Sequence, residues 1–368
     1  MARRPATPGP RNSITDVEGV LVGQWTRLGA ATMGSGWATG ATVVLTPAGA
    51  TASVDVRGGG PGTRETDLLA PHNTVQHVHG IALAGGSAFG LAAADGVMQW
   101  LEQQGHGLRM GSDGAVVPIV PAAVIFDLPV GGWANRPGAA AGHAAAEKAG
   151  RDVETGSVGA GTGARAGALK GGVGTASLCL GAGPAEGLTV GALVVANPVG
   201  SVIDPETGLP WGLLAGIGDE FAAPIPTAEQ IAALRELGAK GTVLNTTIGV
   251  VATDATLDKA GCHRLAVAGQ AGLARAIRPS HSPLDGDTIF AVATGTAALP
   301  PGVTAALPAG IPGGTAVLAE LAAAAASCVE RAIVHAVLAA VPVAGIPAYT
   351  TMVAGTATDT GGDHDLQP

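Results

Sequence analysis

The sequence contains few aromatic and few charged residues. Aromatic residues account for 3% and charged residues for 13% of the 368 positions, and the formal net charge is −9. Binding of nucleic acid depends on clustered basic side chains and on aromatic rings that stack on bases. Anionic membranes likewise attract basic rather than acidic surfaces. We therefore expect neither nucleic acid nor a membrane as a partner.

Cysteine is also scarce. The three cysteines, Cys179, Cys262 and Cys328, are odd in number and far apart in the chain. This pattern predicts no disulfide framework and favours a reducing compartment. No hydrophobic stretch follows Arg3 and Arg4, so an export signal is not expected there. Together these features predict a cytoplasmic protein.

Uninterrupted apolar segments of membrane-spanning length are absent as well. The best candidate, residues 316–343, contains Glu320, Glu330, Arg331 and His335. A stretch of about 18 residues without charges is needed to suggest a membrane helix. We therefore predict that this segment is a buried helix of a globular protein.

What the sequence has in abundance is small residues. It contains 59 glycines and 25 prolines, yet 47% of its residues are hydrophobic. The high apolar content argues against disorder, and a core of Ala, Val, Leu and Ile is expected. A chain of this length allows one large domain or two ordinary ones.

Residue periodicity predicts strands and helices in alternation. Residues 204–241 are rich in proline and suggest a surface excursion around one short helix, which begins with a capping box at Thr227 and Gln230. In residues 156–174 glycine recurs at almost every second position, which fits a flexible linker or an ordered loop beside a site. Strands are predicted at 19–23, 41–46, 52–57, 81–84, 116–126, 175–180, 188–196, 241–253 and 288–293, and helices at 91–101, 138–150, 259–277 and 315–340.

Several common kinds of site are disfavoured. The glycine-rich segments match neither phosphate-binding fingerprint. His72, His77 and His79 are close in sequence, but no carboxylate or cysteine repeats their spacing, so no metal site is predicted. Ser87 resembles a nucleophile elbow, but Phe89 stands where the elbow requires glycine.

The Asn245-Thr246 step allows two interpretations. It is either a polar entry to a β-branched strand or a site of self-cleavage. A threonine hydroxyl is a weak nucleophile unless a base lies beside it, and a free α-amino group on the same residue, with a pKa of about 7.7–8.0, can serve as that base. This chemistry requires Thr246 to become a new N-terminus.

Six ordered sequence blocks resemble one peptidase family. NTTIGVVATDAT at Asn245 to Thr256 is similar to the processing site of the family that contains the D-aminopeptidase DmpA, the β-aminopeptidases and the endo-type nylon-oligomer hydrolase. The other five blocks are DVRGGGPGTRETDLL at 55–69, LAGGSAFGL at 83–91, GAGTGARAGALKGGVGTAS at 159–177, VVANPVGSVID at 194–204 and PLDGDTIFAVATG at 283–295.

The resemblance implies an α/β protein with a four-layer αββα sandwich, the N-terminal-nucleophile hydrolase fold shared with the ornithine acetyltransferases. It implies one domain, 1–368, that cuts itself into chains 1–245 and 246–368. It also implies an oligomer, expected to be a tetramer of such pairs, with no metal and no organic cofactor.

Carried over to this sequence, the resemblance implies that Thr246 is the nucleophile, released by cleavage after Asn245. Lys170 would orient the threonine hydroxyl and favour deprotonated groups nearby. The side-chain amide of Asn197 would form part of an oxyanion hole.

Other positions bear on substrate choice. Asp285 and Asp287 match a catalytic acidic pair of the nylon-oligomer hydrolase that contacts the new N-terminus, where the aminopeptidase branch usually has serine and glutamate. Gly85 and Gly86 would border the substrate pocket with Phe126, which stands where the nylon-oligomer hydrolase has tyrosine. Exopeptidase specificity and activity on nylon oligomers are therefore both open.

These residues lead us to predict a self-processing amidohydrolase that cleaves small peptides or oligoamides through an acyl-enzyme on Thr246. One alternative is an aminopeptidase acting on D- or β-amino-acid N-termini. Another is an acyltransferase of the ornithine acetyltransferase type. A third is an uncut, non-catalytic binding or scaffold protein.

Overall fold

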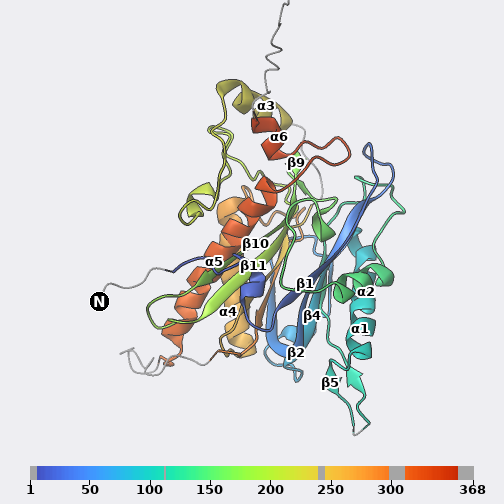
Figure 1. The fold of residues 1–368 in the computed structure, drawn as a ribbon, viewed down its shortest axis with the longest axis vertical. Helices are drawn as coiled ribbons and strands as arrows, with labels where there is room; N and C mark the ends of the chain where they lie inside the picture. The colour runs from blue at the N-terminus through green and yellow to red at the C-terminus, as the bar shows by residue number, and fades with distance from the viewer. Residues whose placement is uncertain (1–5, 112, 239–244, 298–310, 355–368) are drawn as a thin grey trace, which may run out of the picture.

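A mixed β-sheet with helices packed on its outer faces forms the protein (Figure 1). The computed structural model describes residues 6–111, 113–238, 245–297 and 311–354. The main strands are β1 (Leu21–Leu28), β2 (Ala38–Val56), β4 (His77–Ala84), β7 (Ala122–Val124), β10 (Gly172–Cys179), β11 (Thr189–Ala196), β12 (Ile248–Thr253) and β13 (Thr288–Ala293), with short strands β3 (Thr63–Arg64), β5 (Leu108–Arg109), β6 (Val116–Val117), β8 (Arg165–Ala166) and β9 (Leu169–Lys170). The helices are α1 (Ala93–Gln103), α2 (Ala139–Glu147), α3 (Ala228–Gly238), α4 (Lys259–Ala276), α5 (Thr315–Leu338) and α6 (Tyr349–Val353).

Nine strands form one hydrogen-bonded sheet, in the order β10-β11-β12-β13-β2-β4-β7-β3, with β1 also paired to β2. The 19-residue strand β2 joins the two halves of this sheet. The sequence predicts two separate strands here, at 41–46 and 52–57, because turn-forming residues lie between them. Instead, the chain continues through a register shift between Leu45 and Ala50, with Gly49 at φ +87°. Such a bulge accommodates a proline without a donor and bends the strand.

Alternation of side chains along the strands produces the layers. Leu193, Val250 and Phe290 lie in a core between the two halves of the sheet, together with Val44 from β2. Their neighbours on the opposite face, such as Val251, pack against α4 and α5 instead. The outer face of β2 and β4 packs in the same way against α1 and α2. Because strand side chains alternate with period two, each half of the sheet has one inner and one outer face. The αββα prediction is thus confirmed, with β2 linking both β layers.

Helix α5 is the most apolar helix among the described residues. It is long and apolar enough to cross a membrane, but 67% of its most apolar window is buried inside the protein. It packs on α4 and on strands β10 and β11, as Figure 1 shows. The prediction of a buried core helix is therefore confirmed.

The proline-rich region before the proposed cleavage site lies at one end of the molecule, around α3 (Figure 1). Thr227 and Gln230 form the predicted capping box. The Gln230 backbone N–H donates to Thr227 Oγ1 at 3.3 Å, and the Thr227 backbone N–H donates to Gln230 Oε1 at 2.8 Å. The first part of the strand predicted at 241–253 falls in 239–244, which lie outside the described residues.

Candidate active site

Three predicted site residues meet because of the sheet topology. Asn197 follows the last residue of β11, whereas Thr246 and Asp287 precede β12 and β13. Strand β11 runs antiparallel to β12, and β12 runs parallel to β13. The end of β11 therefore lies beside the beginnings of β12 and β13, and residues far apart in sequence come together at one sheet edge.

Thr246 lies in the uncut chain with both of its polar groups engaged. Its backbone N–H donates to the Asn197 carbonyl oxygen at 2.7 Å, and its hydroxyl donates to the Asn245 carbonyl oxygen at 2.5 Å. The residue is 5% exposed. The Asn245 side chain donates from Nδ2 to the Pro198 carbonyl oxygen at 2.7 Å. The hydroxyl of Thr246 is thus held against the peptide bond that would be cleaved.

Only one end of the Asn197 side-chain amide is held by a hydrogen bond among the described residues. Its Oδ1 accepts a hydrogen bond of 2.7 Å from the Arg165 backbone N–H. Its Nδ2 is buried and has no hydrogen-bond partner among the described residues. A buried donor without a partner is costly, so such a group indicates a place where another acceptor is expected to bind.

Asp287 holds the backbone next to Thr246, and Asp285 holds the segment that follows Asn197. Asp287 accepts from the Thr247 N–H at 2.9 Å and from His281 at 2.9 and 3.0 Å. Asp285 accepts from the Val199 N–H at 3.0 Å. Burial is the main cause that raises the Asp285 pKa above its ordinary value. In the uncut chain both carboxylates therefore position neighbouring segments.

A glycine loop closes this side of the site. The Gly60 N–H donates to the Asp285 carbonyl oxygen at 2.8 Å. A Cβ atom on Gly286 would lie 2.8 Å from Thr246 Oγ1 and 2.7 Å from the Gly60 carbonyl oxygen. These distances are too short for a side chain, so glycine at 286 lets the aspartate loop approach the threonine.

Lys170 lies on β9, and its side chain is fully buried. Its Nζ donates to the carbonyl oxygens of Gly161 and Gly171, both at 2.7 Å, rather than to Thr246. A Cβ on Gly171 would lie 2.0 Å from the Ala196 carbonyl oxygen, which places the Lys170 backbone beside the residue preceding Asn197. Burial lowers the Lys170 pKa to about 7, and the charge of Asp127 opposes this shift.

Asp127 is a buried acid that the sequence analysis missed. It accepts from Thr39 Oγ1 and from the Gly86 N–H, both at 2.6 Å, and burial raises its pKa to about 6. A Cβ on Gly85 would lie 2.1 Å from its carboxylate oxygen. The available signal was a single acid within the apolar run 116–130.

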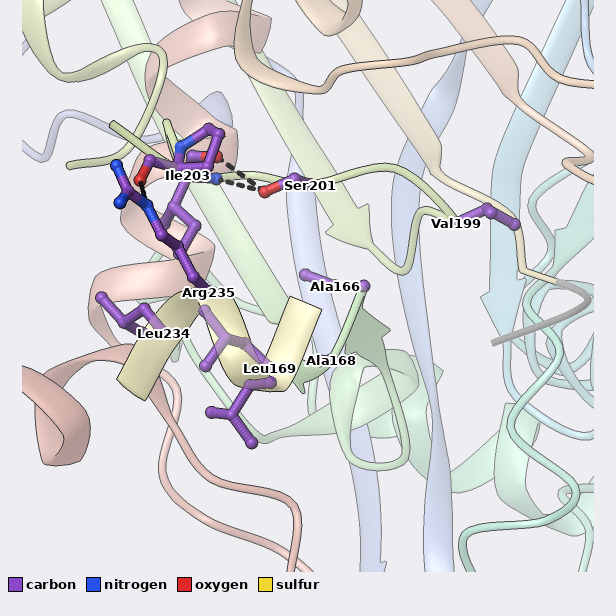
Figure 2. A pocket seen from close by; sticks show the side chains of 11 residues that line it. Ala166, Ala168, Leu169, Val199, Ser201, Ile203, Leu234 and Arg235 are labelled. Atoms are coloured by element: carbon purple, nitrogen blue, oxygen red, sulfur yellow. Dashed lines mark hydrogen bonds between the residues drawn. The ribbon is translucent and has the colours of Figure 1, made fainter. Parts of the chain in front are cut away.

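The three residues predicted to border a substrate pocket thus gather around Asp127. Gly85 and Gly86 enclose its carboxylate, and Phe126 precedes it in sequence. The Phe126 ring meets Trp133 edge to face at a centroid distance of 6.5 Å. A separate cavity beside Asn197 is lined by other residues (Figure 2).

The histidines near residue 79 and the elbow-like Ser87 were disfavoured as sites, and the structure shows what surrounds them. Within the described ranges, no group of three His, Cys, Asp or Glu side chains could hold a metal ion. His79 is buried, and its Nδ1 accepts from the Ile119 N–H at 3.2 Å. Ser87 has φ +53°, but the nearby Phe89 ring lies on the surface under the Arg136 guanidinium.

Comparison with known proteins places this geometry in context. The model of peptidase family S58 matches residues 12–351. An uncharacterized aminopeptidase of Mycobacterium tuberculosis is 57% identical over 349 residues, which cover 94% of this chain and 98% of the relative. A 6-aminohexanoate-oligomer endohydrolase of Kocuria sp. is 32% identical over 274 residues and 71% of both chains.

Solved structures give the same grouping. A Burkholderia sp. β-aminopeptidase has a TM-score of 0.66 and 28% identity over 95% of this chain and 94% of its own. An L-aminopeptidase D-Ala-esterase/amidase from Ochrobactrum anthropi, a variant of the Ntn hydrolase fold, has a TM-score of 0.66 and 23% identity over 91% and 88%. The fold is therefore that of the Ntn hydrolases.

Proposed function

Because this chain belongs to peptidase family S58 and is a hydrolase of amide bonds, we propose that it cleaves itself between Asn245 and Thr246 and then uses Thr246 as its nucleophile. Cleavage would leave chains of 245 and 123 residues within one folded unit. The product would be an amidohydrolase of small peptides or oligoamides.

The first reaction is an acyl shift within the chain. Thr246 Oγ1 attacks the Asn245 carbonyl carbon, an ester bond forms, the peptide C–N bond breaks, and the hydroxyl proton passes to the departing nitrogen. Water then hydrolyses the ester, which releases the Asn245 carboxylate and leaves a free α-amino group on Thr246. The contact of 2.5 Å between Thr246 Oγ1 and the Asn245 carbonyl oxygen supports this step, because the hydroxyl already touches the group that it attacks.

The second reaction uses the new amino group as a base. It takes the proton from Thr246 Oγ1 as the oxygen attacks a substrate amide, and it gives that proton to the leaving nitrogen. Water then hydrolyses the acyl-enzyme by the same path. The Asn197 carbonyl oxygen, which holds the Thr246 nitrogen at 2.7 Å in the uncut chain, would keep this amine beside the hydroxyl.

The observation that carries the proposal is the unpartnered Nδ2 of Asn197. Its own Oδ1 is fixed by the Arg165 N–H, so the amide cannot turn without losing that hydrogen bond. A fixed, neutral donor in a dry site is suited to an oxyanion, since it costs no reorganisation when the charge develops.

The substrate class follows from the relatives and from the acidic pair. The M. tuberculosis relative is named an aminopeptidase, and the Kocuria relative an oligomer endohydrolase. Asp285 and Asp287 are both occupied by internal donors in the uncut chain. We therefore propose both small peptides and oligoamides as substrates. A screen of p-nitroanilides with free and with acetylated amino groups distinguishes cleavage at a chain end from cleavage of internal amides.

Intact-mass measurement and N-terminal sequencing test the proposal. The wild-type protein should yield two chains, the shorter beginning at Thr246, whereas Thr246→Ala should remain whole and inactive. Thr247→Val is the matched control, because it alters the adjacent buried threonine and should still be cut after Asn245. A folded wild-type protein that shows only the 35.6 kDa chain would rule out the mechanism.

A further inference from the structure

A cavity of about 270 Å³ lies beside the candidate site. Figure 2 shows its side chains coming from three segments: the hairpin that joins β8 to β9, the segment after Asn197, and helix α3. Most of the lining is aliphatic: Ala166, Ala168, Leu169, Val199, Ile203, Leu234 and Leu237.

The polar groups at this cavity already have partners. Ser201 Oγ donates to the Ile203 carbonyl oxygen at 2.7 Å. The Arg235 guanidinium donates to the Pro205 carbonyl oxygen at 2.5 Å (Figure 2). It also pairs with Glu206 at 3.0 Å. Among the described residues that line the cavity, the one charged side chain is thus paired with Glu206, and the aliphatic remainder of the lining favours an uncharged aliphatic group.

The cavity is connected to the cleavage site through one peptide group. The Pro198 carbonyl oxygen accepts from the Gly167 N–H, in the cavity wall, at 3.0 Å. The same oxygen accepts from Asn245 Nδ2 at 2.7 Å. On its other side, the Val199 N–H, also in the wall, donates to Asp285 at 3.0 Å. The cavity therefore borders the site rather than a remote surface.

The uncut chain indicates which side of the scissile bond faces the cavity. Asn245 supplies the acyl group of the bond before Thr246, and its side chain points to Pro198. The acyl residue of the scissile bond therefore lies against the same carbonyl oxygen that the cavity wall contacts through Gly167.

We propose that this cavity binds an aliphatic side chain or methylene segment on the acyl side of the substrate's scissile amide. The inference rests on the proposed function, since it assumes that Thr246 is the nucleophile. It assigns to the β8–β9 hairpin and to α3 a role in substrate selection, which neither the relatives' names nor the six sequence blocks specify. Efficient substrates would then be those with leucine-like or polymethylene acyl groups.

Filling the cavity tests this assignment. Ala168→Leu should lower the ratio of kcat/KM for leucyl over glycyl p-nitroanilide at least tenfold, because losing even one methylene contact in an apolar pocket costs about 10-fold or more. Free and acetylated forms of both substrates are assayed. Ala232→Leu, the same change at an exposed position of α3, should leave the ratio as in the wild type. All rates are expressed per molecule cut at Asn245.

Enlarging the cavity provides a second, independent test of the assignment. Leu234→Ala should raise the ratio of phenylalanyl over leucyl turnover at least threefold, because Leu234 is 4% exposed and lines the cavity. The inference is overturned if both variants are cut normally and keep the wild-type ratios. Failure of the proposed function would look different, since wild-type protein would then remain uncut by mass or fail to turn over any amide.

Discussion

Two buried polar regions of this protein differ in how completely their hydrogen bonds are made. We call the first the Arg331 cluster: Arg331, Glu220, Asn12, Ser177 and His335. The Arg331 side chain is fully buried, and its donors go to both Glu220 oxygens, to the Ser177 carbonyl oxygen and to Asn12 Oδ1, at 2.7–3.0 Å. His335 adds a contact of 2.8 Å to Glu220.

The second region is the Thr246 site, where a polar atom remains unpaired. Asn197 Nδ2 is buried and has no hydrogen-bond partner among the described residues. A complete network stabilises one arrangement of the chain, whereas spare donors are kept at an energetic cost. The comparison indicates that the first region serves stability and the second serves chemistry.

The largest expected effect concerns stability, in the Arg331 cluster. Arg331→Met leaves Glu220 buried without its main partner, and breaking a buried ion pair from one side costs about 3–5 kcal/mol. We expect a loss of this size in the free energy of unfolding, measured by urea denaturation in the uncut Thr246→Ala background. With Thr246 intact, kcat per cut molecule should stay near that of the wild type.

A surface ion pair provides the control for this prediction. Arg275 pairs with Glu330 at 3.5 Å, and its side chain is 55% exposed. Exposed pairs contribute about 0–1 kcal/mol, so Arg275→Met should change the free energy of unfolding by no more than that. Equal losses for both variants would contradict the role assigned to the Arg331 cluster.

The layers could be predicted from the sequence because local patterns determine them. The helices α4 and α5 and strands β11 and β13 lie close to their predicted bounds. Strand β2 could not be predicted as one element, because the signals of Pro47 and Gly49 are local, while continuity depends on pairing with β13 and β4. The role of Glu220 was hidden for the same reason, since its partner Arg331 lies 111 positions away.

The next largest effect should appear in the Thr246 site. Asn197→Ala removes the spare donor, and loss of one oxyanion-hole donor typically lowers the rate by about 10²–10³-fold. We expect that fall in kcat per cut molecule, while loss of the Oδ1 acceptor of the Arg165 N–H lowers the free energy of unfolding by about 1–3 kcal/mol. The measurement is steady-state turnover of a p-nitroanilide with the cut fraction determined by mass.

The reverse result would weaken the comparison of the two regions. If Asn197→Ala lowered stability by several kcal/mol and left kcat unchanged, the side chain would be structural. The Arg165 N–H does lose its acceptor in this variant, so Asn197→Asp, which keeps Oδ1 and removes the amide donor, separates the two contributions. It should remain slow, because a carboxylate oxygen cannot donate to an oxyanion, and burial of its unpaired oxygen also lowers stability.

The candidate residues were predicted by family resemblance, and their geometry needed the fold. Lys170 and Asn197 are 27 positions apart, and only the pairing of Gly172 with Ala196 brings their segments together. Asp127 escaped prediction because an acid in an apolar run looks like a turn residue. Its contact with Gly86 spans 41 positions, and no short spacing indicates it.

The smallest predicted effect is a pH dependence of the free energy of unfolding, caused by Lys170 near the Thr246 site. Burial lowers the Lys170 pKa from an ordinary 10.5 to about 7. Between these values the unfolded chain binds more protons than the folded one, so the free energy of unfolding contributed by Lys170 rises with pH. The rise is at most about 1.4 kcal/mol per pH unit for one proton.

The window from pH 7.5 to 8.5 separates this contribution from those of the buried carboxyl groups. Burial raises the pKa values of the Cys262 and Cys328 thiols to about 12, but both thiols are common to the two proteins compared. Asp127 has its pKa raised to about 6, so its contribution falls as pH rises from about 4 to 6 and is constant above that range. In the Arg331 cluster, hydrogen bonds lower the Glu220 pKa, so its stabilisation is lost only as pH falls below about 4.5. Urea unfolding of Thr246→Ala should therefore show a slope with pH that flattens when Lys170→Met is added. Equal slopes in both proteins would mean that burial does not disfavour the charged form of Lys170. The two regions would then not differ in how well they stabilise a buried positive charge.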